Sequence, residues 1–185
     1  MFSVTEGERM QETARFCCGL PLGFEFRPSD KELLEYFLYM KVSRMALPPQ
    51  YDSLIRDCDL YGDLEPWQIW DFYKDDDDVG EEEDMFFFTQ LKTKSGINRK
   101  VGMGSGSWES EDSAKKVPAG ELETKLGFKK RFRYENKASQ EHDGAWIMHE
   151  YSLDPSLLEP SQPNDYVLCR IKRNVKAGKK IKNKR

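Results

Sequence analysis

The stretch LGFKKRFRY, residues 126–134, decides the fold because apolar and cationic side chains alternate along it. One side of an extended chain receives a hydrophobic set, with Lys130 as the exception: Leu126, Phe128, Phe132 and Tyr134. The opposite side receives a glycine and a cationic set: Gly127, Lys129, Arg131 and Arg133. Successive side chains of a strand point to opposite faces. We therefore predict a strand with a hydrophobic face on the core and three cations on the other face.

Three further segments have the composition of strands. Residues 85–91 form a short apolar run with three successive phenylalanines, which suits a strand buried on both faces. Residues 146–153 and 166–171 are rich in aromatic and β-branched side chains, and the loop between them holds Pro155, Pro160 and Pro163. Strands adjacent in sequence with prolines between them favour a twisted antiparallel sheet over a parallel one.

A helix is predicted from about Asp30 to Val42. Ser29 is followed three residues later by Glu32, the pattern of a capping box. Apolar residues then recur at helical spacing: Leu33, Leu34, Phe37 and Leu38. Residues 55–70 favour short extended or helical pieces that pack aromatic side chains. The expected fold class is α+β, mainly β, with a twisted antiparallel sheet flanked by a few helices.

The length of 185 residues and the hydrophobic content of 38% suit one globular domain with short tails. No apolar run approaches the roughly 20 residues needed to cross a bilayer. Glu6, Glu8 and Glu12 are unlike a secretory or organellar signal. We expect a soluble intracellular protein with no membrane partner.

Neither the cysteines nor the acidic segment predict a metal or cofactor. Cys17 and Cys18 are adjacent while Cys58 and Cys169 stand alone, so reduced structural thiols are favoured over zinc ligands. Residues 71–84 carry nine carboxylates and are expected to form a solvated loop. This segment matches the EF-hand pattern at Asp75, Asp77 and Gly80, but Val79 and Phe86 occupy positions that need oxygen ligands.

The net charge of -4 conceals an uneven distribution. Residues 170–185 hold nine Lys or Arg and no Asp or Glu, so residues 1–169 carry 20 basic and 33 acidic side chains. Residues 92–133 hold eleven basic and five acidic side chains. Because nucleic acid responds to the field of one face, screened over about 8 to 10 Å, the local distribution matters more than the total. The cations at Lys129, Arg131 and Arg133 have a phosphate-like spacing of about 6 to 7 Å. From the pattern alone, nucleic-acid binding and a solvated surface both remain open.

No motif supports catalysis. Gly102, Gly104 and Gly106 alternate, but no Gly-Lys-Ser/Thr ending follows, which favours a glycine-bearing turn into a strand over a phosphate loop. The two histidines, His142 and His149, have no nucleophile placed beside them by a motif. We expect no catalytic residues and no enzymatic activity.

Six blocks of the chain, in order over about residues 20–173, resemble the NAC domain of plant transcription factors. LPLGFEFRPSDKELL (20–34) resembles the family's LPPGFRFHPTDEEL, and DLYGDLEPW (59–67) resembles D-x-Y-x-x-x-P-W. GSGSW (104–108) is similar to GSGYW, and LGFKK (126–130) to VGxKK. WIMHEYSL (146–153) is similar to WIMHEYRL, and YVLCRI (166–171) to WVLCRI. The resemblance implies a lead-in at 1–19, a NAC-like domain at 20–173 and a basic tail at 174–185.

The resemblance also implies a function. Members bind duplex DNA as dimers, and press the edge of a twisted antiparallel sheet into the major groove. The strand with the sequence W-K-A-T-G approaches the groove most deeply, which corresponds here to residues 108–112. The resemblance implies this DNA-binding set: Lys94, Arg99, Lys100, Trp108, Glu109, Ser110, Lys115, Lys116, Lys129, Lys130, Arg131, Arg133 and Lys137.

Two departures from the family pattern bear on this expectation. The chain has Glu109, Glu111 and Asp112 within the W-K-A-T-G positions, so carboxylates replace a cation where DNA is expected. Carboxylates accept a hydrogen bond from cytosine N4 but repel phosphates, so we expect weaker binding or an altered sequence preference. In the family an Arg and a Glu pair between subunits, whereas this chain has Glu25 and Glu32 at those positions.

The dimer is therefore expected to be either a homodimer, with Arg27 or Lys31 as the substitute cation, or a heterodimer with another NAC domain. The resemblance implies this dimer interface: Leu20, Pro21, Gly23, Phe24, Glu25, Arg27 and Glu32. The basic tail predicts a nuclear-import signal or a flexible arm for phosphates. The expected nuclear localisation set is Lys172, Arg173, Lys176, Lys179, Lys180, Lys182, Lys184 and Arg185.

The leading hypothesis is a nuclear, DNA-binding transcription regulator with double-stranded DNA as its partner. The alternative is a NAC-like protein-interaction module that pairs with other members and has weak or no DNA binding of its own. No acidic or glutamine-rich segment follows the tail, so we expect either a short regulator or one part of a longer protein.

Overall fold

The computed structural model describes residues 26–74, 84–91, 99–102, 106–120, 125–162 and 165–174, and the backbone of residues 16–17 and 20–21. The strands are β1 (Phe16–Cys17), β2 (Leu20–Pro21), β3 (Ile55–Asp57), β4 (Met85–Gln90), β5 (Lys100–Val101), β6 (Gly106–Ser110), β7 (Lys115–Pro118), β8 (Lys125–Glu135), β9 (Trp146–Leu153) and β10 (Tyr166–Arg173). The helical elements are α2 (Asp30–Glu32), η1 (Leu33–Leu38), α3 (Tyr39–Val42), η2 (Pro49–Tyr51), α4 (Pro66–Tyr73) and η3 (Pro155–Leu157). The α+β, mainly β, fold class is confirmed.

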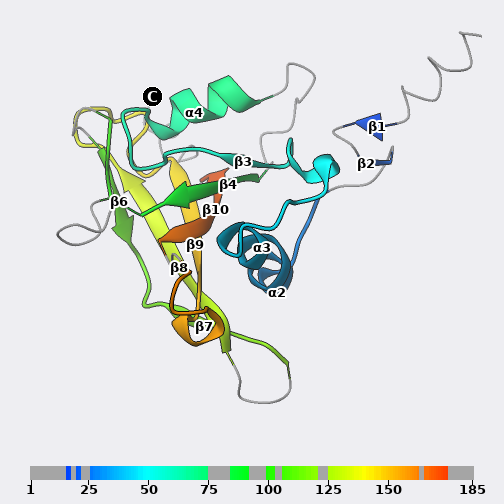
Figure 1. Cartoon of the computed structure of the whole chain (residues 1–185). Coiled ribbons are helices and arrows are strands. Elements are labelled where there is room, and N and C mark those ends of the chain that lie inside the picture. Colours follow the sequence, from blue (N-terminus) through cyan, green and yellow to red (C-terminus); the bar gives the residue numbers. More distant parts are fainter. Residues whose placement is uncertain are drawn as a thin grey trace, which may run out of the picture.

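The main sheet is built around β8. Within the described residues it has eight strands in the order β3-β4-β10-β9-β8-β6-β5, with β7 also paired to β8 (Figure 1). The 11 residues of β8 are enough for its first half to pair with β7 and its second half with β6, while its other side pairs with β9. The strands predicted from residues 126–134, 85–91, 146–153 and 166–171 are confirmed.

One strand pair differs from the predicted antiparallel sheet. β3 runs parallel to β4, with Ile55 opposite Phe86, whereas the other strand pairs of the main sheet are antiparallel. A parallel pair needs a long crossover connection, and the chain between β3 and β4 includes α4. The sheet is therefore mixed at this edge.

The predicted helix at 30–42 is confirmed as the continuous segment α2–η1–α3. The Ser29 hydroxyl accepts a hydrogen bond from the Glu32 N–H at 3.2 Å, and the Glu32 carboxylate accepts one from the Ser29 N–H at 2.8 Å. These two bonds form the predicted capping box and satisfy free N–H groups of the first turn. The middle of the segment, η1, has the wider π-helical pattern. It buries Leu33, Leu34, Phe37 and Leu38.

Two hydrophobic clusters lie on opposite faces of the sheet. One includes Ile69 and Trp70 of α4 together with Trp108, Phe132 and Trp146 of the sheet. The other includes the buried face of α2–η1–α3 together with Phe86, Phe88, Tyr151 and Leu168. Figure 1 shows α4 on one side of β3 and β4 and the α2–α3 segment on the other. The strand β4 is buried on both faces, as its three phenylalanines predict.

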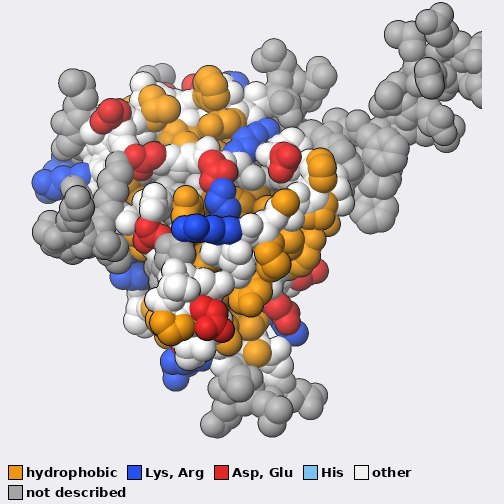
Figure 2. All heavy atoms as spheres, viewed as in Figure 1, with side chains coloured by type: hydrophobic (Ala, Val, Ile, Leu, Met, Phe, Trp, Pro, Cys, Tyr) orange, Lys and Arg blue, Asp and Glu red, His pale blue; other side chains and the backbone are white. Residues whose placement is uncertain are grey.

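The face of the molecule in Figure 2 mixes positive and negative side chains, and hydrophobic side chains gather over and beside the α2–α3 segment. Tyr36, Tyr39 and Met45 are among the exposed large hydrophobic residues. Among the residues that the structure describes, no helix combines the length and apolar character needed to span a bilayer.

The structure describes only part of the predicted acidic loop. Residues 71–73, predicted as part of an acidic loop, belong to the end of α4, while residues 75–83, with the EF-hand-like positions, lie outside the described residues.

Cys58 and Cys169 are free thiols. Burial, with smaller contributions from neighbouring groups, raises the pKa of Cys58 to about 11 and raises that of Cys169 well above its ordinary value. Neither thiol is therefore ionised at neutral pH.

Candidate functional site

The alternating strand β8 presents its cations on one face of the sheet. Arg131 is opposite His149 on β9, and His149 is opposite Arg170 on β10. Arg133 is opposite Ile147, which in turn is opposite Lys172. Side chains directly opposite each other in an antiparallel pair share a face. The register therefore extends the cationic face from β8 across the sheet to β10.

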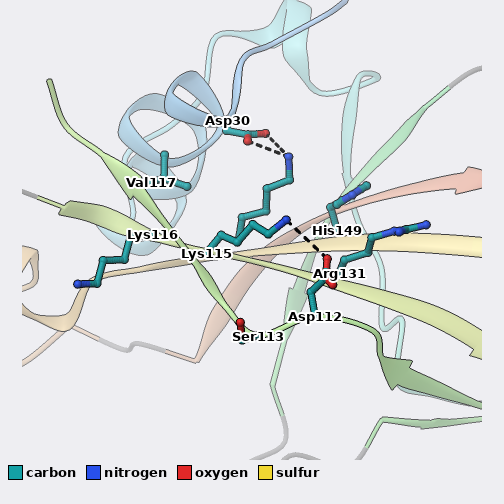
Figure 3. Close-up of a pocket in the computed structure, with 9 residues that line it drawn as sticks. Asp30, Asp112, Ser113, Lys115, Lys116, Val117, Arg131 and His149 are labelled. Carbon is teal, nitrogen blue, oxygen red and sulfur yellow. Dashed lines mark hydrogen bonds and ion pairs between the residues drawn. The ribbon is translucent and has the colours of Figure 1, made fainter.

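A cavity of about 290 Å³ opens at this face between β7, β8, β9 and the start of α2. Its lining residues, most of which are labelled in Figure 3, are Asp30, Asp112, Ser113, Lys115, Lys116, Val117, Lys129, Arg131 and His149. Four of these are cations and two are carboxylates. The cavity thus brings together cations from β7 and β8 that are separated by more than ten residues in the chain.

Lys129 is held in place by the start of the helical segment. Its Nζ lies 2.8 Å from Asp30 Oδ2 (Figure 3), and the Tyr151 hydroxyl donates a hydrogen bond to Asp30 Oδ1 at 2.7 Å. Burial alone raises the pKa of Asp30, but the hydrogen bonds from Lys129 and Tyr151 outweigh it and lower the pKa below its ordinary value. Asp30 therefore stays ionised and joins the helix to β8 and β9.

Arg131 and Arg133 share a carboxylate from the residue that follows β6. Glu111 Oε2 lies 3.1 Å from Arg131 Nε, and Glu111 Oε1 lies 3.7 Å from Arg133 Nε. Arg133 Nη2 also lies 2.5 Å from Glu135 Oε1. The side chains of the two arginines are 42% and 44% exposed, so both remain accessible to a solvent-side partner. The cationic face is therefore partly neutralised from within the chain.

His149 lies among cations and is neutral. Burial lowers its pKa most, and Arg170, Lys129, Lys172 and Arg131 lower it further, to about 3. Its Nδ1 atom is buried and has no hydrogen-bond partner among the residues that the structure describes. His149 therefore adds no charge to the cationic face near neutral pH.

The segment predicted to face the DNA groove has one buried member. Trp108 is 3% exposed and packs against Tyr134 with ring centroids 5.5 Å apart. Glu109 and Ser110 are exposed. The Glu109 carboxylate accepts a hydrogen bond from the Ser107 hydroxyl at 2.6 Å, and Asp112 forms an ion pair with Lys115 at 3.6 Å. Trp108 therefore anchors β6 in the core while its neighbours present polar groups to solvent.

Two of the predicted phosphate-binding residues lie on the opposite face of β8 from Arg131. Arg99 Nη2 lies 2.7 Å from Glu150 Oε1, and the Arg99 guanidinium lies 4.4 Å from the centroid of the Phe132 ring. Its side chain is 15% exposed. Lys130 Nζ lies 5.2 Å from the centroid of the same ring. The structure places Arg99 in an internal ion pair rather than on the cationic face.

The other residues predicted to bind DNA or to form the dimer interface either lie away from the cavity or fall outside the described residues. Lys100 is exposed on β5 and Lys137 is exposed in the turn after β8. Lys94 lies outside the described residues, as do Gly23, Phe24 and Glu25 of the predicted dimer interface. The set of described residues also gives no contact that tests dimer formation. Glu32 is engaged in the capping box, whose hydrogen bonds from Ser29 lower its pKa.

The predicted nuclear localisation set divides at the end of the sheet. Lys172 and Arg173 belong to β10, and the Arg173 guanidinium lies 5.5 Å from the Trp70 ring centroid. The other members, residues 176–185, lie outside the described residues.

The sequence alone indicated Arg170 only as the start of the tail and did not indicate Asp30 as the partner of Lys129. The register of β8, β9 and β10 is the signal that brings these residues to the cationic face.

A curled, mainly antiparallel sheet with cations gathered on one strand face beside a cavity defines an α+β domain. The chain belongs to the No apical meristem (NAM) protein family, whose model matches residues 21–153. The resemblance to the NAC domain is thereby confirmed.

Named relatives agree with this assignment. The chain is 32% identical over 154 residues to NAC domain-containing protein 101 of Arabidopsis thaliana, a match that covers 82% of this chain and 42% of that protein. It is 34% identical over 162 residues to NAC domain-containing protein 2 of Solanum lycopersicum, covering 82% of this chain and 54% of that protein. It is 29% identical over 160 residues to Protein CUP-SHAPED COTYLEDON 1 of Arabidopsis thaliana, covering 82% and 48%. The chain spans about half the length of these relatives.

Proposed function

We propose that this chain is a DNA-binding transcription regulator of the NAC type, and that its cationic face contacts the phosphates of duplex DNA. The family is one of plant transcription factors. The observation that carries the proposal is the gathering of Lys115, Lys129 and Arg131 around one cavity on one face of the sheet. Cations clustered on one face supply the sequence-independent part of DNA affinity.

The proposed interface has a phosphate-contacting part and a groove-facing part. Lys115 lies opposite Lys129 on the cationic face, and its side chain is 71% exposed beside Asp112, so its charge is available to a phosphate. Glu109 and Ser110 on β6 are exposed beside the cationic strand and are the proposed groove-facing residues. Phosphate contacts position a protein on the duplex, and base-edge contacts give it specificity. Carboxylates at the groove favour cytosine N4 as a base contact.

The test is the salt dependence of duplex affinity in two matched variants. Lys115→Gln removes a cation from the proposed interface, and Lys130→Gln removes one from the opposite face of the sheet. We expect the affinity of the unaltered protein to fall steeply with salt, and the slope of log K against log[salt] to shrink by about 0.9 in Lys115→Gln. Lys130→Gln should keep the original slope. Equal slopes in both variants would contradict the proposed interface.

Selection from a random duplex library measures the groove-facing part separately. An enriched motif that changes in Glu109→Lys would support base contact at β6. The absence of any enriched motif with the unaltered protein would argue against sequence-specific recognition.

A second candidate function is a protein-interaction module that pairs with other NAC domains and weakens their DNA binding. The observation in its favour is the pairing of Lys129, Arg131 and Arg133 with carboxylates of the same chain. Partner binding that does not change with salt, with no gel shift on any duplex, would favour this function.

We also propose dimerisation through the N-terminal region and localisation in the nucleus. The dimer is a homodimer or a heterodimer with another NAC domain. Nuclear entry is proposed to depend on the basic tail, residues 174–185. Size-exclusion chromatography coupled to light scattering tests the dimer, and the distribution of a fluorescent fusion with and without residues 174–185 tests the tail.

A further inference from the structure

The Glu111 carboxylate forms ion pairs with two arginines of β8, Arg131 and Arg133. Glu111 directly follows β6, and its backbone N–H donates a hydrogen bond to the Arg131 carbonyl at 3.1 Å. This bond fixes the Glu111 backbone beside β8, and the side chain then turns onto the cationic face. Its two carboxylate oxygens lie 3.1 Å from Arg131 Nε and 3.7 Å from Arg133 Nε.

This arrangement is that of an anion held by two guanidinium groups. Arg131 and Arg133 are two residues apart on one strand face, a separation of about 6 to 7 Å along the strand. A guanidinium recognises carboxylate and phosphate through the same donors and the same charge. A carboxylate placed between two such groups therefore satisfies the donors that a DNA phosphate oxygen would otherwise use.

The other carboxylates of the segment are engaged elsewhere. Glu109 accepts a hydrogen bond from Ser107, and Asp112 pairs with Lys115 at 3.6 Å. Neither forms an ion pair with Arg131 or Arg133 among the described residues. The bridging position belongs to Glu111 specifically, rather than to the acidity of the segment as a whole.

We propose that Glu111 is an internal competitor of DNA phosphate, an autoinhibitory contact that withholds Arg131 and Arg133 from the duplex. This inference rests on the proposed function. Lys115 and Lys129 supply the phosphate contacts while Glu111 holds the two arginines. When Glu111 is displaced, Arg131 loses its carboxylate partner and adds a contact on the same face, whereas Arg133 keeps Glu135 at 2.5 Å and adds a second contact only where a phosphate also displaces Glu135. Removing the carboxylate therefore increases DNA affinity through these two residues.

The experiment compares Glu111→Gln with Glu159→Gln, which neutralises an exposed carboxylate in the loop after η3 and changes the net charge equally. Fluorescence anisotropy measures the affinity of each variant for the same duplex over a range of salt concentrations. We expect Glu111→Gln to bind about tenfold more tightly at low salt, with a slope steeper by about 0.9 for one added phosphate contact at Arg131 and by up to about 1.8 if Arg133 also leaves Glu135. Glu159→Gln should shift affinity much less and leave the slope unchanged.

The inference requires that the gain in DNA affinity of Glu111→Gln depends on Arg131 and Arg133. Adding Arg131→Gln and Arg133→Gln to Glu111→Gln should return both the affinity and the slope to those of the unaltered protein. Urea unfolding of each variant identifies any loss of folded protein, and Glu111 lies near the surface, where such substitutions usually change stability little.

The outcomes separate this inference from the proposed function. If the unaltered protein binds with salt-dependent affinity but Glu111→Gln behaves like Glu159→Gln, the inference is wrong and the proposed function stands. The inference also fails if the gain survives without the arginines. If neither the unaltered protein nor Glu111→Gln binds any duplex, the proposed function fails and the inference fails with it. DNA binding only by Glu111→Gln would support both.

Discussion

Arg99 and Glu150 form an ion pair in the interior, beside the phenol of Tyr61. The Tyr61 hydroxyl donates a hydrogen bond to Glu150 Oε2 at 2.5 Å, and the side chains of Arg99 and Glu150 are 15% and 8% exposed. An unpaired charge in such a place is costly, because neither water nor another ion replaces the lost partner. The pair is therefore expected to act on stability rather than on a ligand.

Arg99→Met should lower the free energy of unfolding by about 3 kcal/mol, because Glu150 loses its buried partner. Adding Glu150→Gln should restore part of this loss, since the glutamine is neutral and still accepts the Tyr61 hydrogen bond. Urea unfolding of the two single variants and the double variant measures the coupling. Strictly additive losses would show that the two side chains do not depend on each other.

The neutral state of His149 makes stability depend on pH. Its pKa is about 3 in the folded protein, lowered by burial and by the surrounding cations, and about 6.5 when unfolded. The unfolded chain therefore takes up a proton that the folded protein does not, so stability is full above about pH 6.5 and falls as pH decreases toward 3. We expect Tm to fall between pH 7 and pH 5 by less in His149→Gln than in the unaltered protein. The carboxylates with lowered pKa, such as Asp30, titrate below this window. Equal pH profiles would contradict the assignment to His149.

At the scale of elements, Gly127 sets the distance between β8 and β9. A Cβ added at Gly127 would overlap the backbone carbonyl of Ser152, which cannot move without moving the strand. Gly120, in the turn after β7, has open space around it. We expect Gly127→Ala to lower the free energy of unfolding by about 1 to 3 kcal/mol. Gly120→Ala should change it by less than about 0.5 kcal/mol. Thermal and urea unfolding of the two variants provide the measurement, and similar values for both would contradict close packing at Gly127.

Elements with local signals were predictable from the sequence. The capping box at Ser29 and Glu32 marks the helix start, and the alternation at 126–134 marks β8, because both signals depend on neighbours in the chain. The parallel pairing of β3 was not predictable, since a three-residue strand has no pattern of its own. The end of α4 was also missed, because Asp71 belongs to the acidic run while its backbone continues the helix.

The candidate site was predictable in part for the same reason. The shared face of Lys129, Arg131 and Arg133 follows from strand periodicity, but the partners of these cations are distant in sequence. Asp30 lies 99 residues from Lys129, so only the packing of the helix on the sheet brings the two together. Arg99 shows the converse, because a basic residue in a basic stretch is directed inward by Glu150, which lies 51 residues away.

At the scale of the whole molecule, the charge of the cationic face depends on which of its cations form ion pairs rather than on the net charge of the chain. The chain carries a net charge of -4, yet one sheet face collects cations from β7, β8 and β10. Their carboxylate partners come from the helix start, from the residues after β6 and from the end of β8. The surface potential of this face therefore depends on which internal pairs are formed, and substitutions at the carboxylates are expected to change it as strongly as substitutions at the cations.

The strand order also dictates when the domain is able to form during synthesis. β10, residues 166–173, lies between β4 and β9. Before these residues leave the ribosome, no strand joins β4 to β9, so each of these two strands lacks its β10 partner. The last strand thus closes the domain by inserting between them. We expect a nascent chain stalled before Tyr166 to present two open edges to chaperones, because its long-range pairing is completed only when β10 has emerged.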